Sequence, residues 1–294
     1  MRYADLPNGD AQGYFGVDDT NGSLNRQTPD KVKLAAALVE SGEVFSLNAP
    51  LSWPDPPLFS RQPIRHTVYE TPLGNLDDFL DGFYPQGSSQ WDGFLHIKNS
   101  EIGFYNHHPR EKLGVHTWAQ RGIVGRGILF DMPRWYAQSG REMQWNRRDV
   151  ISIGDLEGFR AAAGIEPRDG DVLLFRTGWS RGWEAATDEE RAAARGNPVS
   201  PGLQDGEEML AYLWDWGVSA VASDNPSLEA WPLTENFLHP HLLGKLGIPI
   251  GELWWLDSLA DNCAADGRYE FLLTSAPLHV LGGVGSTANA LAIK

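Results

Sequence analysis

The second half of the chain alternates between two hydrophobic patterns. Short continuous apolar runs predict buried strands, and apolar residues at helical spacing that end at a glycine predict helices between them. The strands expected here are residues 171–177, 218–223, 248–255, 271–273 and 278–281. The helices expected are residues 153–163, 187–195, 204–217 and 237–246. Strands that alternate with helices in this way are typical of an α/β fold.

The first half is richer in strands and loops. A helix is expected at residues 28–39, where Thr28 can cap the first turn, Pro29 suits the first helical position and Gly42 can end the helix. Further strands are expected at 44–51, 58–70, 90–97 and 127–131, and a short helix at 117–122. The pattern predicts a turn at 76–82 and loops at 98–112 and 133–150.

We expect one α/β domain, residues 1–294, with a mixed sheet. A chain of 294 residues can bury a large core, and no linker, repeat or low-complexity stretch divides it. Residues 1–27 are rich in glycine, aspartate and asparagine and have no periodicity. This composition predicts an irregular N-terminal arm that lies on the body of the domain.

The charge balance excludes several classes of partner. The formal net charge is −15, and a negative field repels nucleic acid and anionic lipid. No apolar run approaches the roughly 20 residues needed to cross a bilayer, and the first residues resemble no signal peptide. We therefore expect a small-molecule substrate, no nucleic acid and no membrane. A small anionic substrate would need a local positive patch or a metal ion to offset the charge.

Cysteine is nearly absent. Cys263 is the single cysteine, so no internal disulfide can form, which suits a reducing, cytoplasmic location. A zinc site made of several cysteines is excluded for the same reason. Any metal must therefore be held by histidine, carboxylate and amide ligands.

Residues 86–96 concentrate such ligands. Gln86 and Gln90 offer neutral amide oxygens, Asp92 offers a carboxylate and His96 an imidazole. Gln90 and Asp92 are two residues apart, so both point to the same face of a strand and can be aimed at one cation. The spacing alone also fits ordinary polar side chains on a solvated strand face.

A second group of donors follows late in the chain. His239 stands near the start of an expected helix, and Glu252 lies on the strand that follows it. Histidine with glutamate is a usual pair of zinc or manganese ligands. Glu252 is embedded among Ile250, Leu253 and Trp254, and a carboxylate in a buried strand must be paired or bind a cation. For His239, an ordinary surface histidine is the alternative.

These motifs resemble the cyclase family of metal-dependent hydrolases, which includes kynurenine formamidase and isatin hydrolase. That family carries the motif His-x-x-x-His-x-Asp-x-x-x-His, and here glutamine replaces the first two histidines at the same spacing. The glutamine version is similar to that of trans-dienelactone hydrolase. The likeness extends to residues 16–25, 121–131, 170–179 and 277–286. It implies the swivelling β/β/α fold of the family and a homo-oligomer, either a dimer or a tetramer.

The resemblance also implies a site with one divalent metal, with zinc as the first candidate and manganese as the second. The implied ligands are Gln86, Gln90, Asp92, His239 and Glu252. An amide oxygen is a weaker ligand than imidazole, so we expect one metal where formamidase-type sites hold two. The glutamines can alternatively hydrogen-bond the metal water or the substrate. His96 occupies the acid–base position of the family, with a role as a further ligand as the alternative.

Aromatic and polar residues near these motifs are candidates for the substrate pocket. They are Trp91, Phe94, Tyr105 and His108, with core packing as the alternative for the three aromatic residues and an ordinary loop position as the alternative for His108. Asp224 ends a buried strand and is a candidate to support the site from behind the ligands. Three functions are open: a metal-dependent hydrolase that opens a lactone, an amide hydrolase of the formamidase or isatin type, and a non-catalytic protein whose metal site has decayed through the two glutamines.

Overall fold

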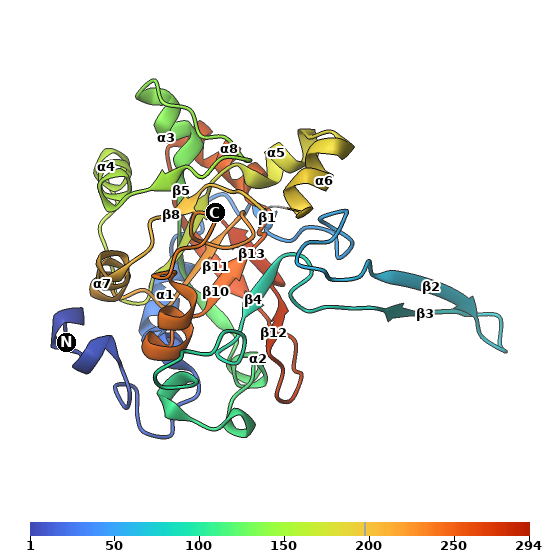
Figure 1. Cartoon of the computed structure of the whole chain (residues 1–294), viewed down its shortest axis with the longest axis horizontal. Helices are drawn as coiled ribbons and strands as arrows, with labels where there is room; N and C mark the ends of the chain where they lie inside the picture. The colour runs from blue at the N-terminus through green and yellow to red at the C-terminus, as the bar shows by residue number, and fades with distance from the viewer. Residues whose placement is uncertain (197) are drawn as a thin grey trace.

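A curled mixed sheet forms the centre of the protein (Figure 1). The computed structural model describes residues 1–196 and 198–294. Among those residues, nine strands join in the order β1-β13-β11-β5-β7-β9-β10-β4-β12. Neighbours from β5 to β10 run parallel, and the other neighbours run antiparallel. The strands are β1 Val44–Ser46, β4 Gln90–Asp92, β5 Ile123–Asp131, β7 Val172–Arg176, β9 Ala220–Ser223, β10 Ile250–Glu252, β11 Glu270–Ser275, β12 Gly285–Thr287 and β13 Ala290–Ile293.

The connection between β12 and β13 explains why the sheet curls. β12 is the last strand in the order and β13 the second, yet only residues 288–289 join them. So short a link spans about 10 Å at most, so the two ends of the sheet must approach each other. The backbone N–H of Trp255, just after β10, accordingly donates to the carbonyl of Leu47, just after β1, at 3.0 Å. This hydrogen bond joins the segment after edge strand β1 to the segment after β10, near the opposite end of the sheet, so the sheet curls around one core.

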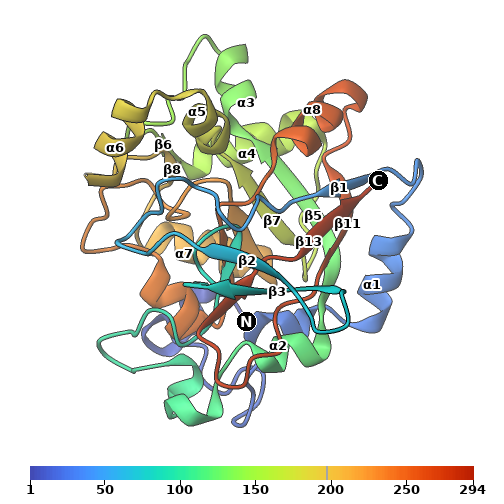
Figure 2. The same ribbon diagram turned by 90° about the vertical axis from the view of Figure 1, so that its right-hand side faces the viewer.

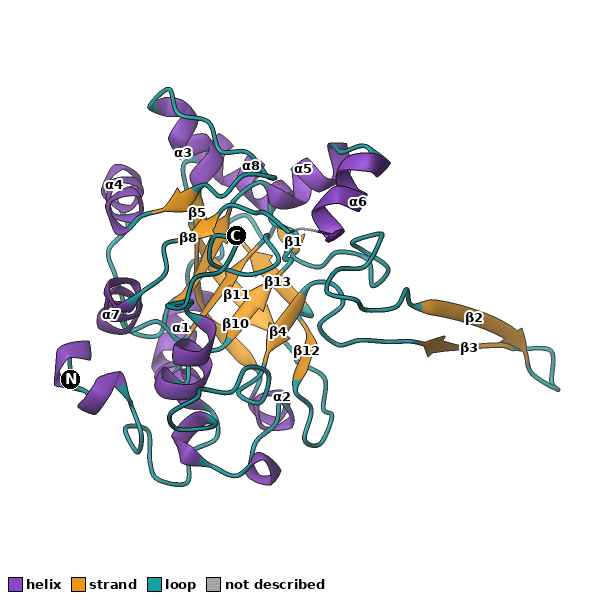
Figure 3. Cartoon of the chain, in the orientation of Figure 1, coloured by secondary structure: helices purple, strands orange, loops and turns teal. Residues whose placement is uncertain are grey.

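Helices surround the sheet (Figure 3). The parallel strands β7 and β9 are buried at every position, as their continuous apolar runs predict. Helix α1 packs against β5 and β11, and α4 packs against β5. The helices are α1 Pro29–Ala36, α2 His116–Arg121, α3 Met132–Gln138, α4 Ile153–Ala163, α5 Trp179–Ala185, α6 Asp188–Gly196, α7 Glu207–Trp216 and α8 Asp257–Asp266. Within the described residues, none of them is both long and apolar enough to cross a membrane.

Residues 1–27 lie against the body through short 3₁₀ turns at Tyr3–Asp5, Pro7–Gly9 and Gly22–Arg26. Gly22 has a φ of +59°, and a Cβ there would lie 2.1 Å from the carbonyl oxygen of Gly247. The backbone N–H of Ser23 donates to that same carbonyl at 2.8 Å. A glycine is therefore required where this segment meets the turn that precedes β10.

An isolated two-stranded ribbon projects from the body at the right of Figure 1 and faces the viewer in Figure 2. It consists of β2 Arg65–Glu70 and β3 Leu76–Asp81, paired antiparallel from Arg65 opposite Asp81 to Glu70 opposite Leu76. All six residues of β3 and five of the six of β2 are exposed. A second small sheet pairs β6 Val150–Ile151 with β8 Gly202–Leu203 in parallel.

The α/β fold with a mixed sheet is confirmed, and helix α4 coincides with the expected residues 153–163. Several local predictions are wrong. The turn expected at 76–82 is strand β3, whose exposed acidic sequence lacks an apolar face. The loop expected at 133–150 begins with helix α3, and α5 and α8 were not foreseen. The strand expected at 278–281 is a loop that precedes β12. The helix expected at 237–246 is present over Pro240–Leu246 but as a π-helix.

Candidate metal centre

Asp92, His239 and Glu252 meet at one point inside the domain. Asp92 ends β4, Glu252 ends β10, and His239 directly precedes the π-helix Pro240–Leu246. β4 and β10 pair antiparallel with Ile250 opposite Asp92, so the two carboxylates lie on one face as diagonal neighbours. One ligand atom from each of the three residues lies within 4.8 Å of the others.

The distances within this group are short. His239 Nε2 lies 3.0 Å from Glu252 Oε1 and 3.7 Å from Asp92 Oδ2. Gln90, two residues before Asp92 on the same face, donates from Nε2 to Glu252 Oε2 at 2.6 Å. All four side chains are buried. The arrangement thus gathers two carboxylates, an imidazole and an amide in a site with little access to water.

Several oxygens in this group have no hydrogen-bond partner. Within residues 1–196 and 198–294, both carboxylate oxygens of Asp92 and Oε1 of Gln90 are buried and unpaired. Leaving a buried polar group unpaired costs about 1–3 kcal/mol, and more when the group is charged. A divalent cation would satisfy all three oxygens, and this mixture of oxygen and imidazole donors suits zinc or manganese. The residues present therefore fit a metal ion.

Glu229 holds His239 from behind. Its Oε1 accepts a hydrogen bond from His239 Nδ1 at 2.9 Å and another from the backbone N–H of Leu238 at 3.1 Å. Histidines that ligate metals usually donate their second N–H to a carboxylate in this way, which fixes the ring and raises its basicity. Sequence reasoning missed Glu229. Its position between the apolar residues Leu228 and Ala230 is the same signal that singled out Glu252.

The electrostatics of the group reflect its crowded carboxylates. Burial would lower the pKa of His239, but the charge of Glu229 and the nearby carboxylates of Asp92 and Glu252 raise the pKa well above its usual value. Burial and the charge of Asp92 raise the pKa of Glu252 to about 7, although His239 opposes them. Without a cation, the site therefore retains protons that a metal ion would displace.

His96 lies beside the group at the edge of the buried region. Its Nε2 is 3.6 Å from Asp92 Oδ1, and Gln86 Nε2 is 3.3 Å from its Nδ1. Burial lowers the pKa of His96, because the opposing effect of Asp92 is smaller and the charges of His239 and Arg61 add to the lowering. Gln86 thus contacts His96 and makes no hydrogen bond to Asp92, His239 or Glu252 in the described chain. Its position fits a role in orienting His96 better than one in binding the metal.

A cavity of about 240 Å³ opens onto this group. Asp92, His96, His239 and Glu252 form one part of its wall. The rest of the lining is mostly apolar and comes from loops far apart in the sequence. These residues are Phe59, Arg61, Ile97, Pro226, Ser227, Trp231, Leu233 and Phe237. A largely apolar cavity with a few convergent polar groups is typical of a site for a small molecule.

Comparison with known proteins identifies the family. The family model Cyclase matches residues 45–230, which is more than half of the chain. The chain belongs to the cyclase family. A crystal structure described as a novel cyclase is 32% identical with a TM-score of 0.87, and the match covers 97% of this chain and 99% of that one. A search of curated proteins found no match.

Two isatin hydrolases share the fold of this cyclase-family chain at lower identity. Isatin hydrolase A from Labrenzia aggregata, bound to benzyl benzoate, is 17% identical with a TM-score of 0.62, covering 88% of this chain and 95% of that one. An isatin hydrolase bound to the product analogue thioisatinate is 18% identical with a TM-score of 0.60, covering 88% and 94%. At this identity, the likeness establishes the fold.

The four expected pocket residues of this cyclase-family protein lie elsewhere, as none of them is among the residues that line the cavity. Trp91 projects from β4 away from Gln90 and Asp92, and its Nε1 donates to Ser275 Oγ at 2.9 Å. Phe94 packs on Tyr105, with ring centroids 4.6 Å apart. Tyr105 contacts the N-terminal segment, since its hydroxyl donates to Asp19 Oδ2 at 2.9 Å. His108 contacts the same segment, with its Nε2 3.0 Å from the carbonyl oxygen of Asp19. Core packing therefore describes the three aromatic residues better, and a structural loop position describes His108 better.

Asp224 is buried but serves a different part of the fold. Its Oδ1 accepts from the backbone N–H and the hydroxyl of Thr177 at 2.6 and 2.7 Å, and its Oδ2 accepts from the N–H of Gly178 at 2.9 Å. Burial raises the pKa of Asp224 to about 6, against the opposing charge of Arg176. These bonds fix the turn between β7 and α5. We expected Asp224 to support the proposed metal ligands from behind. Glu229 does so instead, through its hydrogen bond to His239.

Proposed function

We propose that this member of the cyclase family is a metal-dependent hydrolase that opens a small cyclic ester. The observation that supports the proposal best is the buried group of Asp92, His239 and Glu252, in which both oxygens of Asp92 lack a hydrogen-bond partner among the described residues. A purely structural role would leave that carboxylate buried at a cost of several kcal/mol. A divalent ion removes the cost and supplies the chemistry.

One ion, zinc first and manganese second, would be held by Asp92, His239 and Glu252. Gln90 is the candidate for a further ligand, because its unpaired Oε1 adjoins the group. When bound, such an ion lowers the pKa of a water molecule towards about 7 and polarises a carbonyl oxygen. Glu229 orients His239 through its Nδ1.

His96 would act as the general base and then as the general acid. Its lowered pKa leaves the ring neutral near pH 7, so it can accept a proton from the attacking water and return it to the leaving oxygen. Nε2 faces Asp92 and the cavity and would take that proton, which requires the neutral ring to carry its own proton on Nδ1 and the Gln86 amide to turn its oxygen towards Nδ1. The proposal thus assigns Gln86 to orientation, in place of the metal-ligand role expected from its spacing.

The lactone is the first substrate class because the glutamine motif is similar to that of trans-dienelactone hydrolase. A cyclic amide is the second class, supported by the shared fold of proteins described as isatin hydrolases. Both reactions add water to a carbonyl and differ in whether oxygen or nitrogen leaves. The third class, a decayed non-catalytic site, is disfavoured by the unpaired oxygens of Asp92 and Gln90, which a bound cation would satisfy together.

The decisive experiment joins metal content to activity. Purified protein should hold close to one zinc or manganese ion per chain by elemental analysis. Chelation should abolish hydrolysis across a panel of lactones, isatin and formyl-kynurenine, and zinc or manganese should restore it. Turnover that persists in fully stripped protein would overturn the proposal. Protein without metal and without activity on any of these substrates would favour the decayed site.

We also propose a homo-oligomer, a dimer or a tetramer. The ribbon of β2 and β3 exposes apolar side chains on a two-stranded sheet, and such a sheet has marginal stability in water when nothing covers it. Its exposed apolar residues are Val68, Tyr69, Leu73, Leu76, Phe79 and Leu80. Sedimentation of the intact chain, compared with a variant in which Leu76 and Phe79 are replaced by serine, tests this. A monomeric wild-type protein would contradict it.

A further inference from the structure

Arg61 brings a positive charge to the wall of the cavity and has no partner there. Throughout the described part of the chain, no carboxylate lies within 4.0 Å of its guanidinium and no side-chain hydrogen bond reaches it. The deeply buried arginines behave differently, as Arg126 pairs with Asp171 and Arg176 with Asp131, both at 2.7 Å. Arginine has five N–H donors, and a half-buried one that leaves them unused has them available for a ligand.

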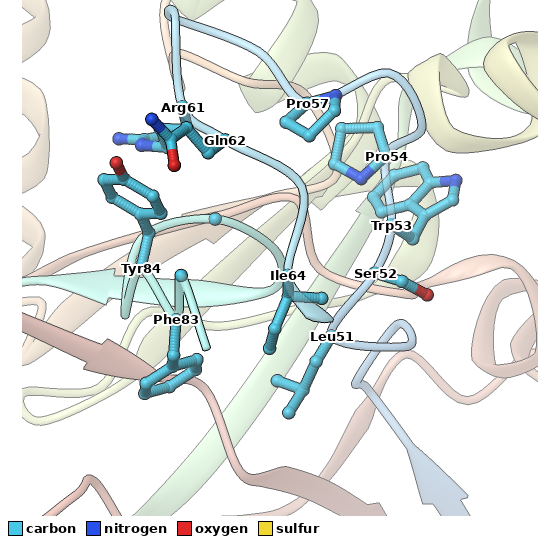
Figure 4. A pocket seen from close by; sticks show the side chains of 12 residues that line it. Leu51, Ser52, Trp53, Pro54, Pro57, Arg61, Gln62, Ile64, Phe83 and Tyr84 are labelled. Atoms are coloured by element: carbon cyan, nitrogen blue, oxygen red, sulfur yellow. The ribbon is translucent and has the colours of Figure 1, made fainter. Parts of the chain in front are cut away.

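The segment that carries Arg61 is held in a strained turn. Phe59 and Ser60 have φ values of +53° and +60°, an uncommon conformation for residues other than glycine. The Arg61 guanidinium carbon lies 5.4 Å from the centre of the Phe59 ring. Figure 4 shows Arg61 extending beside Tyr84, on the opposite side of this loop from Trp53 and Pro54. Strain of this kind persists where the surrounding structure requires it, and here it places Phe59 and Arg61 in the wall of the same cavity.

Arg61 is also close to the metal-binding group. Burial lowers the pKa of Arg61, while the charges of Glu252, Asp92 and Tyr84 oppose this effect. The charge of Arg61 in turn lowers the pKa of His96. A ligand in the cavity would therefore meet the reacting groups and the guanidinium at the same time.

The remaining wall suits a planar group. Phe59 and Trp231 approach with ring centroids 5.8 Å apart, and Phe237 lies next to His239 with centroids 6.4 Å apart. These faces favour an unsaturated or aromatic ring, because flat apolar surfaces stack on one another. The net charge of −15 would repel an organic anion from the protein as a whole, so a local cation is needed to accept one.

We propose that Arg61 is the specificity residue of this site and that the substrate is a small planar cyclic ester or amide bearing a carboxylate away from the bond that breaks. This inference rests on the proposed hydrolase function. The guanidinium binds that carboxylate through two parallel N–H···O bonds, a geometry that lysine cannot supply. The aromatic residues hold the ring, and the carbonyl to be attacked faces Asp92, His96, His239 and Glu252.

The first test compares pairs of substrates. Each pair consists of a carboxylate-bearing unsaturated lactone or cyclic amide and its uncharged carboxamide analogue. We expect Arg61→Gln to lower kcat/KM for the charged member about 10- to 100-fold, mainly through KM, because a hydrogen bond to a charged group is worth that much. The uncharged member should change by less than about threefold. Arg61→Lys should recover only part of the loss. Equal losses for both members, or no loss for either, would overturn the proposal.

The matched control is Arg65→Gln, four positions along the same segment. The Arg65 side chain is 76% exposed and pairs with Asp81 at the base of the ribbon, outside the cavity. This substitution removes the same charge at the start of β2 but away from the cavity, so it should leave the preference for the charged substrate unchanged. A loss of preference in Arg65→Gln equal to that in Arg61→Gln would mean that overall charge, and not Arg61, sets specificity.

A binding test separates this inference from the hydrolase proposal. Aromatic dicarboxylates of increasing length and their monoamides are titrated by calorimetry into zinc-supplemented protein, without any turnover. Wild-type protein should prefer at least one dicarboxylate by about tenfold or more, and Arg61→Gln should lose that preference. If nothing is hydrolysed but the preference disappears with Arg61, the hydrolase proposal fails and the anion site stands. If the preference survives in Arg61→Gln, or wild type shows none, the anion site fails whatever the activity.

Discussion

Replacing Glu229 by glutamine tests the metal centre without substituting any proposed metal ligand. Glu229 is 1% exposed, and its Oε1 accepts from His239 Nδ1 at 2.9 Å and from the Leu238 N–H at 3.1 Å. A glutamine has the same size and keeps one carbonyl oxygen for these donors, so the fold should survive. It removes the negative charge that favours a proton on Nδ1 and leaves Nε2 basic for a metal ion.

The size of the effect follows from this geometry. A buried hydrogen bond to a charged partner is worth about 1.5–3 kcal/mol, and a neutral acceptor returns roughly half of that. Changes to residues that support metal ligands usually lower metal affinity 10- to 100-fold, or about 1.4–2.7 kcal/mol. We therefore expect zinc to bind Glu229→Gln about 10- to 100-fold more weakly than wild type, at a similar melting temperature of the metal-free protein.

The assay is competition for zinc against a chromophoric chelator, with the melting temperature measured on the same samples. Glu235→Gln is the control, because Glu235 lies on the same connection before His239 but is exposed. It should match wild type. Zinc affinity within about twofold of wild type in a folded Glu229→Gln protein would refute the reasoning, since Glu229 would then only fill space.

Three further predictions concern the same centre. Asp92→Asn should lose metal binding. It should also raise the melting temperature of the metal-free protein by a few degrees, because it removes a buried charge that has no partner among the described residues. Unchanged metal content would contradict this prediction. Zinc affinity should rise between about pH 6 and pH 8, because zinc must displace the protons that His239 and Glu252 hold. The pKa of His239 is raised well above its usual value, and that of Glu252 is raised to about 7. Equal zinc affinities at pH 6 and pH 8 would count against this prediction. His96→Ala should lose hydrolysis but keep its metal. His279 is exposed, so the control His279→Ala should keep both. Loss of metal in His96→Ala would show that His96 is a metal ligand.

The sequence was informative where one residue type has few physical explanations. A glutamate inside an apolar strand needs a partner or a cation, and Glu252 lies in the group of Asp92 and His239. The period of two along a strand put Gln90 and Asp92 on one face. The same period required Trp91 to face the other way, so its assignment to the substrate pocket could have been rejected from the sequence.

Residues positioned by irregular segments could not be predicted. Arg61 follows a proline-rich loop without periodicity, and it reaches the cavity only because the backbone at Phe59 and Ser60 turns through left-handed φ values. The apolar neighbours of Glu229 mark it as buried, but it follows Leu228, which has a φ of +56°, and no helical or strand pattern places it behind His239. β3 was mistaken for a turn because a ribbon exposed on both faces has no apolar side to produce alternation.

The β2–β3 ribbon has a mechanical consequence for catalysis. Strand β2 begins shortly after Arg61, and the chain that leaves β3 leads to Gln86, which contacts His96. Asp92 and Glu252, in contrast, are anchored in the central sheet. A molecule that binds the ribbon and bends it would displace Arg61 and Gln86, to which we assign substrate choice and the orientation of His96, while Asp92 and Glu252 stay in place. Under these proposals, such a ligand would change turnover at constant metal content.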